Sequence, residues 1–325
     1  MLFADMHSHF LLNAYYLGRT FNHGGRDRFP FGPFGNRLDL EGCLEGGLRC
    51  LTFTAYVPFA VSEVQAYVAQ LRLVERIAQA SSGKVVVART GAQARAVAES
   101  GRLAAVLAVE GGHSIGKDLR NLRELACIGA RMLTITHFVA NALGDSSQSP
   151  YKPHGGLSAF GRKAVREMQG LGIIPDVAHL SDDGVRQVLD IATGPIVCSH
   201  TGMRALCPIP RNLPDDLALA IARTGGLVGV VLFPPYLEHR ALRVPFERFL
   251  DHVVHAAHTV GPEHVAVGSD LDGWTWTPDG FRGPRDTSMI AEGLVRRGFS
   301  DSEIAAICFE NYLRLLDQGM TQVPL

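Results

Sequence analysis

Two histidines stand directly after two neighbouring apolar stretches near the middle of the chain. His179 follows the stretch Ile173–Ala178, and His200 follows the stretch Ile196–Ser199. Between them, apolar side chains recur at helical spacing behind Ser181, a residue type that caps helices. Because two short strands joined by a helix pair in parallel, we expect both imidazoles at one edge of a sheet, where they could hold a metal ion. The alternative is that each histidine only bonds a loop carbonyl.

Other residues able to do chemistry occupy the same position relative to further apolar stretches. They are His7 and His9 after the first stretch, Glu110 after the third, His137 after the fourth and Asp270 after the eighth. The C-terminal ends of the strands of a parallel barrel meet at one face, which is where such barrels have their active sites. Chance would scatter histidines and acids along the strands, so their recurrence at one end favours a functional site over unrelated structural roles.

The make-up of this set indicates two metal ions. Four of these histidines, His7, His9, His179 and His200, and a glutamate exceed the needs of one tetrahedral zinc ion, and Glu110 is the only strand-end carboxylate placed to bridge two. No strand ends in lysine, so a carboxylated lysine is not available as the bridge. Two ions about 3.5–4 Å apart would share a water and lower its pKa, which gives a bridging hydroxide nucleophile. Asp270 is then a candidate proton shuttle and His137 a candidate oxyanion stabiliser.

The elements that would position these residues alternate between strand and helix. We predict eight strands, over residues 2–6, 49–57, 103–109, 132–136, 173–178, 196–199, 226–233 and 264–269, and a small extra strand over 84–88. Predicted helices cover 38–46, 61–80, 91–99, 119–128, 158–170, the segment after Ser181, 214–223, 245–259, 287–297 and 301–316. This alternation predicts a (β/α)8 barrel. A doubly wound open sheet is the rival, but no glycine-rich phosphate loop follows the first strand.

We expect one catalytic domain over residues 1–325, because no repeat or linker interrupts the chain. Residues 10–38 lack periodicity and are expected to form a long loop over the C-terminal face of the barrel, as a lid. The net charge is −1, which gives no strong field for nucleic acid or an acidic membrane, and no apolar stretch is long enough to span a bilayer. The six cysteines form no CxxC pair or disulfide framework, and no signal peptide is visible, so we expect a cytoplasmic location.

Six segments carry a resemblance to a known family. They are AVEGGHSIG (108–116), RMLTITHFVAN (131–141), GRKAVREMQGLGIIPDVAHLS (161–181), IVCSHTGMRALCPIPRNLPDD (196–216), TGGLVGVV (224–231) and HVAVGSDLDG (264–273). In the order and spacing of these segments the chain resembles the membrane (renal) dipeptidase family of metallopeptidases, a branch of the amidohydrolase barrels. The resemblance implies a (β/α)8 barrel with two zinc ions that hydrolyses dipeptides, and it suggests a homodimer.

The resemblance also implies roles for individual residues. His7 would bind the first metal ion, Glu110 would bridge the two ions, and His179 and His200 would hold the second. His137 would contact the substrate and the tetrahedral intermediate.

The remaining matches concern the substrate. Asp270 would handle the proton that passes to the leaving amine. Arg211 matches the family arginine that binds the free carboxylate of the substrate, a task suited to a planar guanidinium. Its alternative is an ion pair with the aspartates at 215–216. Tyr236 lies where the family has an aromatic pocket wall, although simple packing is the alternative.

The first strand departs from the family pattern. The family has His-x-Asp where this chain has His7-Ser8-His9, which is the pattern of the wider amidohydrolase group. His9 can still bind a metal, but it removes one negative charge, so the first ion is expected to bind less tightly, or a softer ion is preferred. One ion instead of two therefore stays open. Two other functions also stay open. The protein could hydrolyse a lactone, a cyclic amide or another non-peptide amide, or it could be a barrel that binds metal without catalysis.

Four further histidines and one aspartate receive structural interpretations. We expect His113 to support a loop, and His252, His255 and His258 to lie on the solvent face of a helix. Asp5 is expected to orient a metal ligand from behind.

Overall fold

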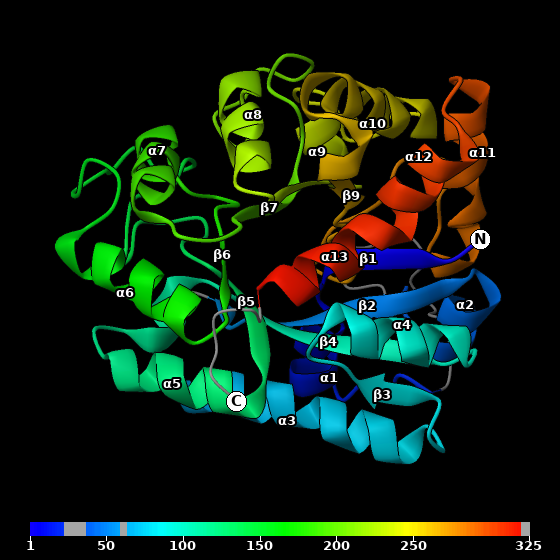
Figure 1. The fold of residues 1–325 in the computed structure, drawn as a ribbon, viewed down its shortest axis with the longest axis horizontal. Coiled ribbons are helices and arrows are strands. Elements are labelled where there is room, and N and C mark those ends of the chain that lie inside the picture. The colour runs from blue at the N-terminus through cyan, green and yellow to red at the C-terminus, as the bar shows by residue number, and fades with distance from the viewer. Residues whose placement is uncertain (23–36, 59–63, 320–325) are drawn as a thin grey trace.

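The computed structural model describes residues 1–22, 37–58 and 64–319. Within these ranges eight parallel strands follow one another in the order β1-β2-β4-β5-β6-β7-β8-β9, and β3 pairs with β4 outside this path (Figure 1). The strands are β1 (Phe3–Ser8), β2 (Leu48–Ala55), β3 (Val85–Val87), β4 (Leu103–Glu110), β5 (Ala130–Thr134), β6 (Ile174–Asp176), β7 (Val197–Thr201), β8 (Leu227–Val230) and β9 (Val265–Val267).

The last and first barrel strands meet through backbone hydrogen bonds just beyond β9. The Asp270 N–H donates to the His7 carbonyl at 2.9 Å, and the His9 N–H donates to the Leu271 carbonyl at 2.8 Å. A parallel bridge joins Ser8 and Leu271. The sheet is therefore a nearly closed barrel, and the predicted (β/α)8 fold and the extra strand are confirmed.

Helices surround the strands (Figure 1). They are α1 (Phe10–Leu17), α2 (Leu40–Glu45), α3 (Val64–Ala80), α4 (Gly91–Glu99), α5 (Leu119–Ile128), α6 (Ala159–Gly170), α7 (Asp182–Ile191), α8 (Asp215–Arg223), α9 (Pro234–Leu237), α10 (Phe246–Val260), α11 (Ser288–Arg296), α12 (Asp301–Ala305) and α13 (Asn311–Gln318). Several begin at a side-chain cap, as predicted for Ser181, whose hydroxyl accepts from the Gly184 N–H. No helix in the described ranges is long and apolar enough to cross a membrane.

Two sets of buried side chains form the core. The larger set lies between the strands and the outer helices. The smaller set fills the barrel interior, where Ala104, Val106 and Ala108 of β4 meet residues of all the other barrel strands and of α13. Because side chains of a strand alternate between its two faces, Glu110 continues this inward-facing series. A helix therefore closes one end of the barrel, and polar side chains occupy the other.

Several predicted bounds are wrong in detail. The first part of the expected loop 10–38 is instead the helix α1, because Phe10, Leu11 and Leu12 turn into the core. Residues 23–36 lie outside the described ranges, so the lid remains a prediction. The helix predicted over 301–316 is α12 and α13 joined by a π-helical segment, Ala306–Glu310. Strands β6 and β9 are shorter than predicted, because the chain leaves the sheet before the expected strand ends.

Candidate active site

The carboxylate of Glu110 lies among buried histidines at the C-terminal ends of the strands. Its side chain is 1% exposed, and its Oε1 atom is 3.2 Å from His179 Nε2, 3.4 Å from His200 Nε2 and 3.6 Å from His7 Nε2. Among the described residues Oε1 has no hydrogen-bond partner. A buried carboxylate oxygen without a hydrogen-bond donor is well placed to bind a cation.

The second oxygen of Glu110 faces other imidazoles. Oε2 lies 3.2 Å from His9 Nε2 and 3.7 Å from His137 Nε2. His9 Nε2 is also 3.2 Å from Asp270 Oδ1. The two oxygens thus face different histidines, as those of a carboxylate that bridges two metal ions would.

The Nε2 atoms also approach one another in pairs. His7 and His9 have their Nε2 atoms 3.0 Å apart, and so do His179 and His200. Nitrogens bound to one tetrahedral zinc ion are roughly 3.3 Å apart, given zinc–nitrogen distances of about 2.0–2.1 Å. The ligand atoms of His7, His9 and Glu110 form one compact group, and those of Glu110, His137 and His179 form another. The residues present therefore fit a centre that holds metal ions.

Most imidazoles of the centre are held neutral. Burial, followed by nearby positive charges, lowers the pKa well below its usual value in four of them: His7, His137, His179 and His200. His9 is the exception: burial lowers its pKa, but the Glu110 and Asp270 carboxylates outweigh burial and raise the pKa to about 10. Neutral imidazole is the form that binds a metal, so the lowered pKa values of His7, His179 and His200 suit this role.

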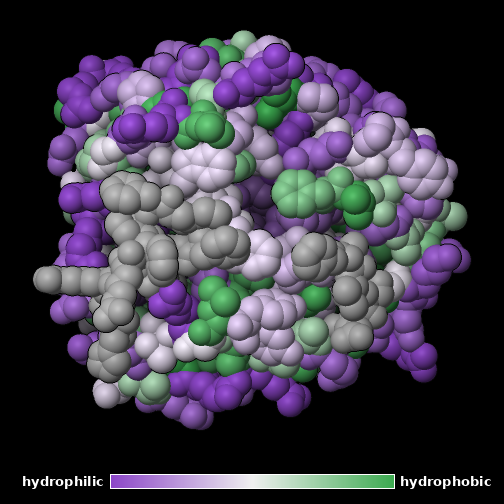
Figure 2. Space-filling view, turned by 180° about the vertical axis from the view of Figure 1, so that it is seen from behind, coloured by the Kyte–Doolittle hydropathy of each residue, from purple (hydrophilic) through white to green (hydrophobic). Residues whose placement is uncertain are grey.

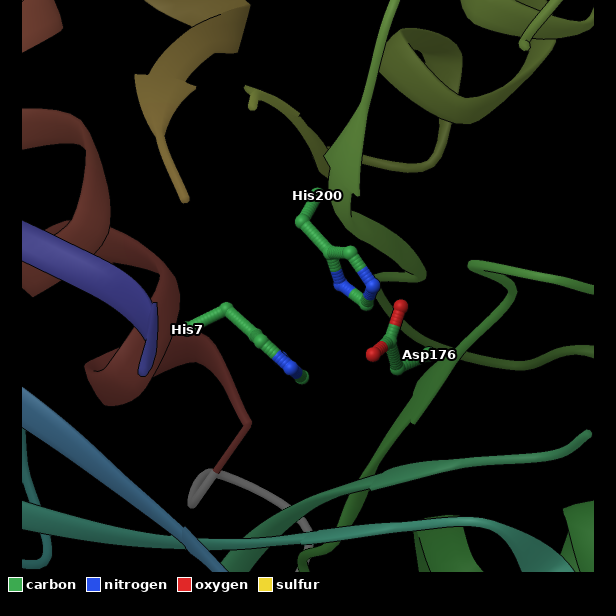
Figure 3. A group of neighbouring side chains, drawn as sticks. All are labelled: His7, Asp176 and His200. Carbon is green, nitrogen blue, oxygen red and sulfur yellow. The ribbon is translucent and has the colours of Figure 1, made fainter. Parts of the chain in front are cut away.

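A buried serine fixes which ring nitrogen carries the proton in two of the histidines. Ser199 Oγ donates to Asp176 Oδ2 at 2.6 Å, so its lone pairs accept from His200 Nδ1–H at 2.9 Å and His7 Nδ1–H at 3.2 Å. Figure 3 shows His7, Asp176 and His200 converging from three strands. With Nδ1 protonated, each Nε2 lone pair is free to face the centre.

Asp176 was not among the predicted site residues, because the prediction rested on residues that follow apolar stretches. Asp176 Oδ1 accepts from the Ser199 and Ala178 N–H groups, and Oδ2 accepts from the Thr134 and Ser199 hydroxyls. These four hydrogen bonds use the lone pairs of the carboxylate, so it supports the histidines and is not left for a metal. An acid inside an apolar strand was the available signal, since a buried charge requires partners.

Gln148, in the loop before α6, was also missed. Its Oε1 lies 2.6 Å from His179 Nδ1, and its Nε2 donates to the Tyr236 hydroxyl at 3.2 Å. A glutamine in a polar loop has no local feature that would identify this contact.

Arg211 and Tyr236 lie together beside His200, one of the candidate metal ligands. Arg211 is 5% exposed, its Nη2 donates to the His200 carbonyl at 2.8 Å, and its guanidinium carbon lies 4.9 Å from the Tyr236 ring centre. Its Nε and Nη1 atoms have no hydrogen-bond partner in the described ranges. The alternative pairing with aspartates 215–216 is wrong, because these bind His255 and Arg186. The buried cation therefore has donors left for an anionic group.

Some of the predicted site residues lie within strands, and others lie in the segments that follow the strands. His7, Glu110 and His200 lie within strands, whereas His9, His137, His179 and Asp270 lie beyond them. His179 and Asp270 adopt left-handed backbone conformations, with φ of 65° and 59°. Such conformations are costly for residues with side chains and are concentrated at functional sites. They turn these side chains inward after the chain has left the sheet.

The structural roles predicted for His113, His252 and Asp5 are confirmed for His113 but not for His252. His113 supports its loop as predicted, with Nε2 2.6 Å from the Tyr67 hydroxyl. His252 is not on the surface: it is buried, accepts from the Met203 N–H and lies 2.9 Å from the Leu237 carbonyl, because α10 packs this side against the barrel loops. Asp5 accepts from the backbone N–H of His7, so it holds the strand and not the ring.

Comparisons with known proteins identify the family. The model of the membrane dipeptidase family (peptidase family M19) matches residues 34–322. Dipeptidase verJ of Clonostachys rogersoniana is 32% identical over 294 residues, which are 86% of this chain and 75% of that protein. Dipeptidase 3 of Mus musculus is 29% identical over 290 residues, 87% of this chain and 58% of that protein.

Solved structures agree with this result. A metallopeptidase from Rhodobacter sphaeroides, liganded with a phosphinate mimic of the dipeptide L-Ala-D-Ala, superposes with a TM-score of 0.89 at 25% identity over 98% of this chain and 99% of that one. The dipeptidase AC, a metallopeptidase, superposes with a TM-score of 0.89 at 26% identity over 98% of both chains. The chain therefore belongs to the membrane dipeptidase family, peptidase family M19, and is a peptide-bond hydrolase.

Proposed function

We propose that the protein is a binuclear zinc dipeptidase that cleaves dipeptides with a free C-terminal carboxylate. One observation carries the proposal: Glu110 presents its two oxygens to different groups of histidines, near an arginine whose Nε and Nη1 have no partner among the residues that the structure describes. Curated relatives are dipeptidases, and a similar structure holds a dipeptide mimic.

The donor set suits zinc. Imidazole nitrogens and carboxylate oxygens are zinc ligands, and His7, His179 and His200 each have a polar partner at Nδ1. Zinc, when bound, supplies a water that is acidic enough to act as a nucleophile near neutral pH.

The protein's own residues would perform the remaining tasks. Arg211, seated on Tyr236, would bind the substrate carboxylate through its unpartnered N–H groups and so orient the peptide bond. His137 would donate to the oxygen that becomes negative in the transition state, from its place 3.7 Å from Glu110 Oε2. Asp270 would accept the proton of the attacking water and return it to the leaving amine.

A second candidate is hydrolysis of a lactone, a cyclic amide or another non-peptide amide at a single ion. His9 favours it, since this imidazole adds no negative charge and its Nδ1 has no hydrogen-bond partner within the described part of the chain.

Activity toward matched substrates separates the two candidates. The purified protein is expected to cleave L-Ala-L-Ala and L-Ala-D-Ala, to lose activity with a chelator and to regain it with zinc. The C-terminal amide of L-Ala-L-Ala should be a poor substrate, and Arg211→Ala should raise KM for the free dipeptide. Arg186→Ala, which removes an exposed arginine, is the control. Lactone cleavage that is insensitive to Arg211→Ala, without dipeptide cleavage, would refute the dipeptidase proposal.

A further inference from the structure

Gln148 lies between the candidate metal ligands and the residues proposed to bind the substrate carboxylate. Its carboxamide contacts the candidate metal ligand His179 through Oε1 at 2.6 Å, and the pocket residue Tyr236 through Nε2 at 3.2 Å. Tyr236 in turn carries the guanidinium of Arg211 on its ring. One side chain thus joins the residues that would hold zinc to those that would hold the substrate.

The chemistry of the carboxamide gives each contact a direction. A carbonyl oxygen only accepts, so the proton of this hydrogen bond resides on His179 Nδ1. The Nε2 lone pair of His179 then faces Glu110 Oε1 at 3.2 Å and His200 Nε2 at 3.0 Å. In the opposite orientation the amide NH2 would donate to Nδ1, and the ring proton would occupy the position where a metal must bind.

The second contact leaves the Tyr236 hydroxyl with a proton to donate. The phenol oxygen accepts from Gln148 Nε2, and burial raises the pKa of Tyr236, so the hydroxyl remains protonated. This proton and the unpartnered N–H groups of Arg211 are donors on neighbouring side chains. A substrate carboxylate could accept from both.

Backbone contacts tie the loop of Gln148 to the segment that carries His179. The Ser147 N–H donates to the His179 carbonyl at 2.7 Å, and the Ser181 N–H donates to the Asp145 carbonyl at 2.9 Å. An antiparallel bridge joins residues 146 and 180. The loop and the ligand are therefore held in register, and the hydrogen bond of Gln148 to His179 is not a contact between independently moving parts.

We propose that Gln148 is a positioning residue with two separable effects, an inference that rests on the proposed dipeptidase function. Its oxygen holds His179 in the tautomer that binds zinc. Its nitrogen holds Tyr236, and through it Arg211, in the orientation that binds the substrate carboxylate.

Three substitutions separate the two effects. Gln148→Leu removes both contacts. Gln148→Glu retains an acceptor for His179 but has no N–H for Tyr236, and Tyr236→Phe removes only the hydroxyl contact. Gln65→Leu is the matched control, because Gln65 is exposed and, within the described ranges, its side chain bonds Glu124 alone.

The first measurement is zinc transfer from the zinc-loaded full chain to a chromophoric chelator, with no substrate present. Gln148→Leu is expected to weaken zinc binding about 10- to 100-fold, as loss of a hydrogen bond to a metal-binding histidine does. Gln148→Glu, Tyr236→Phe and Gln65→Leu should not weaken it. Equal weakening by Gln148→Leu and Gln148→Glu would overturn the proposal, because the effect would then belong to the loop and not to the bond with His179.

The second measurement is the separation of KM from kcat with L-Ala-L-Ala. Gln148→Glu and Tyr236→Phe should each raise KM roughly tenfold, the effect of one lost hydrogen bond to a charged group, and the double variant should be no worse than either. An unchanged KM in both would overturn the second half of the proposal. If the unmodified chain cleaves no dipeptide, the dipeptidase proposal fails, whereas zinc transfer still tests the bond to His179.

Discussion

His9 differs in charge from the other imidazoles of the centre, and in support from His7, His179 and His200. The Nδ1 atoms of His7, His179 and His200 each face a polar partner, whereas His9 Nδ1 has none among the residues described. Two carboxylates raise its pKa to about 10, so without metal it carries a proton near Glu110 Oε2. This proton supplies positive charge where the first ion would bind.

His9→Asp is therefore expected to strengthen binding of the first ion. The change removes a competing proton and adds a carboxylate, which should lower the dissociation constant of the weaker zinc ion by at least about tenfold. Zinc per chain, measured after dialysis against a series of zinc concentrations, checks this. His258→Asp makes the same change on an exposed helix position. Equal zinc content in wild type and His9→Asp at every concentration would contradict the expectation.

Asp270→Asn separates proton transfer from metal binding. Asparagine has the same shape but cannot carry the proton, so kcat for dipeptides should fall roughly 10²- to 10⁴-fold. Zinc content should stay the same, because the role we propose for Asp270 is proton transfer and not metal binding. Asp279→Asn, at an exposed aspartate, is the control. A barrel that only binds metal would show no change in any activity.

At the scale of elements, α10 holds the segments that carry Met203 and Leu237. His252 Nδ1 accepts from the Met203 N–H, so its Nε2 carries the proton and donates to the Leu237 carbonyl of α9. Burial lowers the pKa of His252 to about 4. A second proton on this ring would break the bond from Met203.

The stability of the fold should consequently depend on pH through His252. In the unfolded chain the His252 ring takes up a proton near pH 6.5, and in the folded chain only near pH 4. The free energy of unfolding therefore falls as the pH drops between these values. The full effect is about 3 kcal/mol. Urea unfolding of wild type and His252→Gln across this range checks it, since the variant should lose less stability on acidification. His258→Gln should behave like wild type.

Gly268, directly after β9, lies so close to Ser199 of β7 that only a residue without a side chain fits there. A Cβ atom on Gly268 would lie 1.8 Å from the Ser199 carbonyl oxygen. Gly268→Ala should therefore cost about 3 kcal/mol or more and displace the serine that supports His7 and His200. Gly170→Ala, where a Cβ meets nothing within 4 Å, should change stability by less than about 1 kcal/mol. Unfolding free energies of the two variants in urea make the comparison.

At the scale of the whole molecule, the barrel is closed at one end and open at the other. Residues of α13 fill the interior from one side, and the Tyr312 hydroxyl lies 2.6 Å from Thr52 Oγ1. The view from the opposite side shows a hollow with hydrophilic residues in its depth (Figure 2). The cytoplasmic location, the homodimer and the single domain over residues 1–325 remain predictions.

Metal removal should lower the stability of the whole barrel, because the ligands come from strands that are distant in sequence. An ion that binds only the folded state adds about 2.7 kcal/mol to the free energy of unfolding when its free concentration is a hundred times the dissociation constant. A chelator should thus lower the unfolding midpoint by roughly 5 °C or more, and added zinc should restore it. Calorimetry with and without chelator measures this shift. An unchanged midpoint would show that these residues hold no metal in the folded protein.

The sequence by itself determined the barrel and most of the site. Apolar stretches that end in histidine or an acid are local patterns, and parallel strands bring such ends to one face, which placed His7, Glu110, His179 and His200 together. The departure at position 9 was recognisable because the family that the chain resembles has His-x-Asp where this chain has His7-Ser8-His9.

Only the tertiary structure decided how these residues are supported. Asp176 and Gln148 act through hydrogen bonds to side chains from other segments, and His252 is buried because loops from elsewhere pack over its helix. Such contacts depend on the distance between atoms that the chain brings together from separate segments, and no spacing along the sequence encodes that distance.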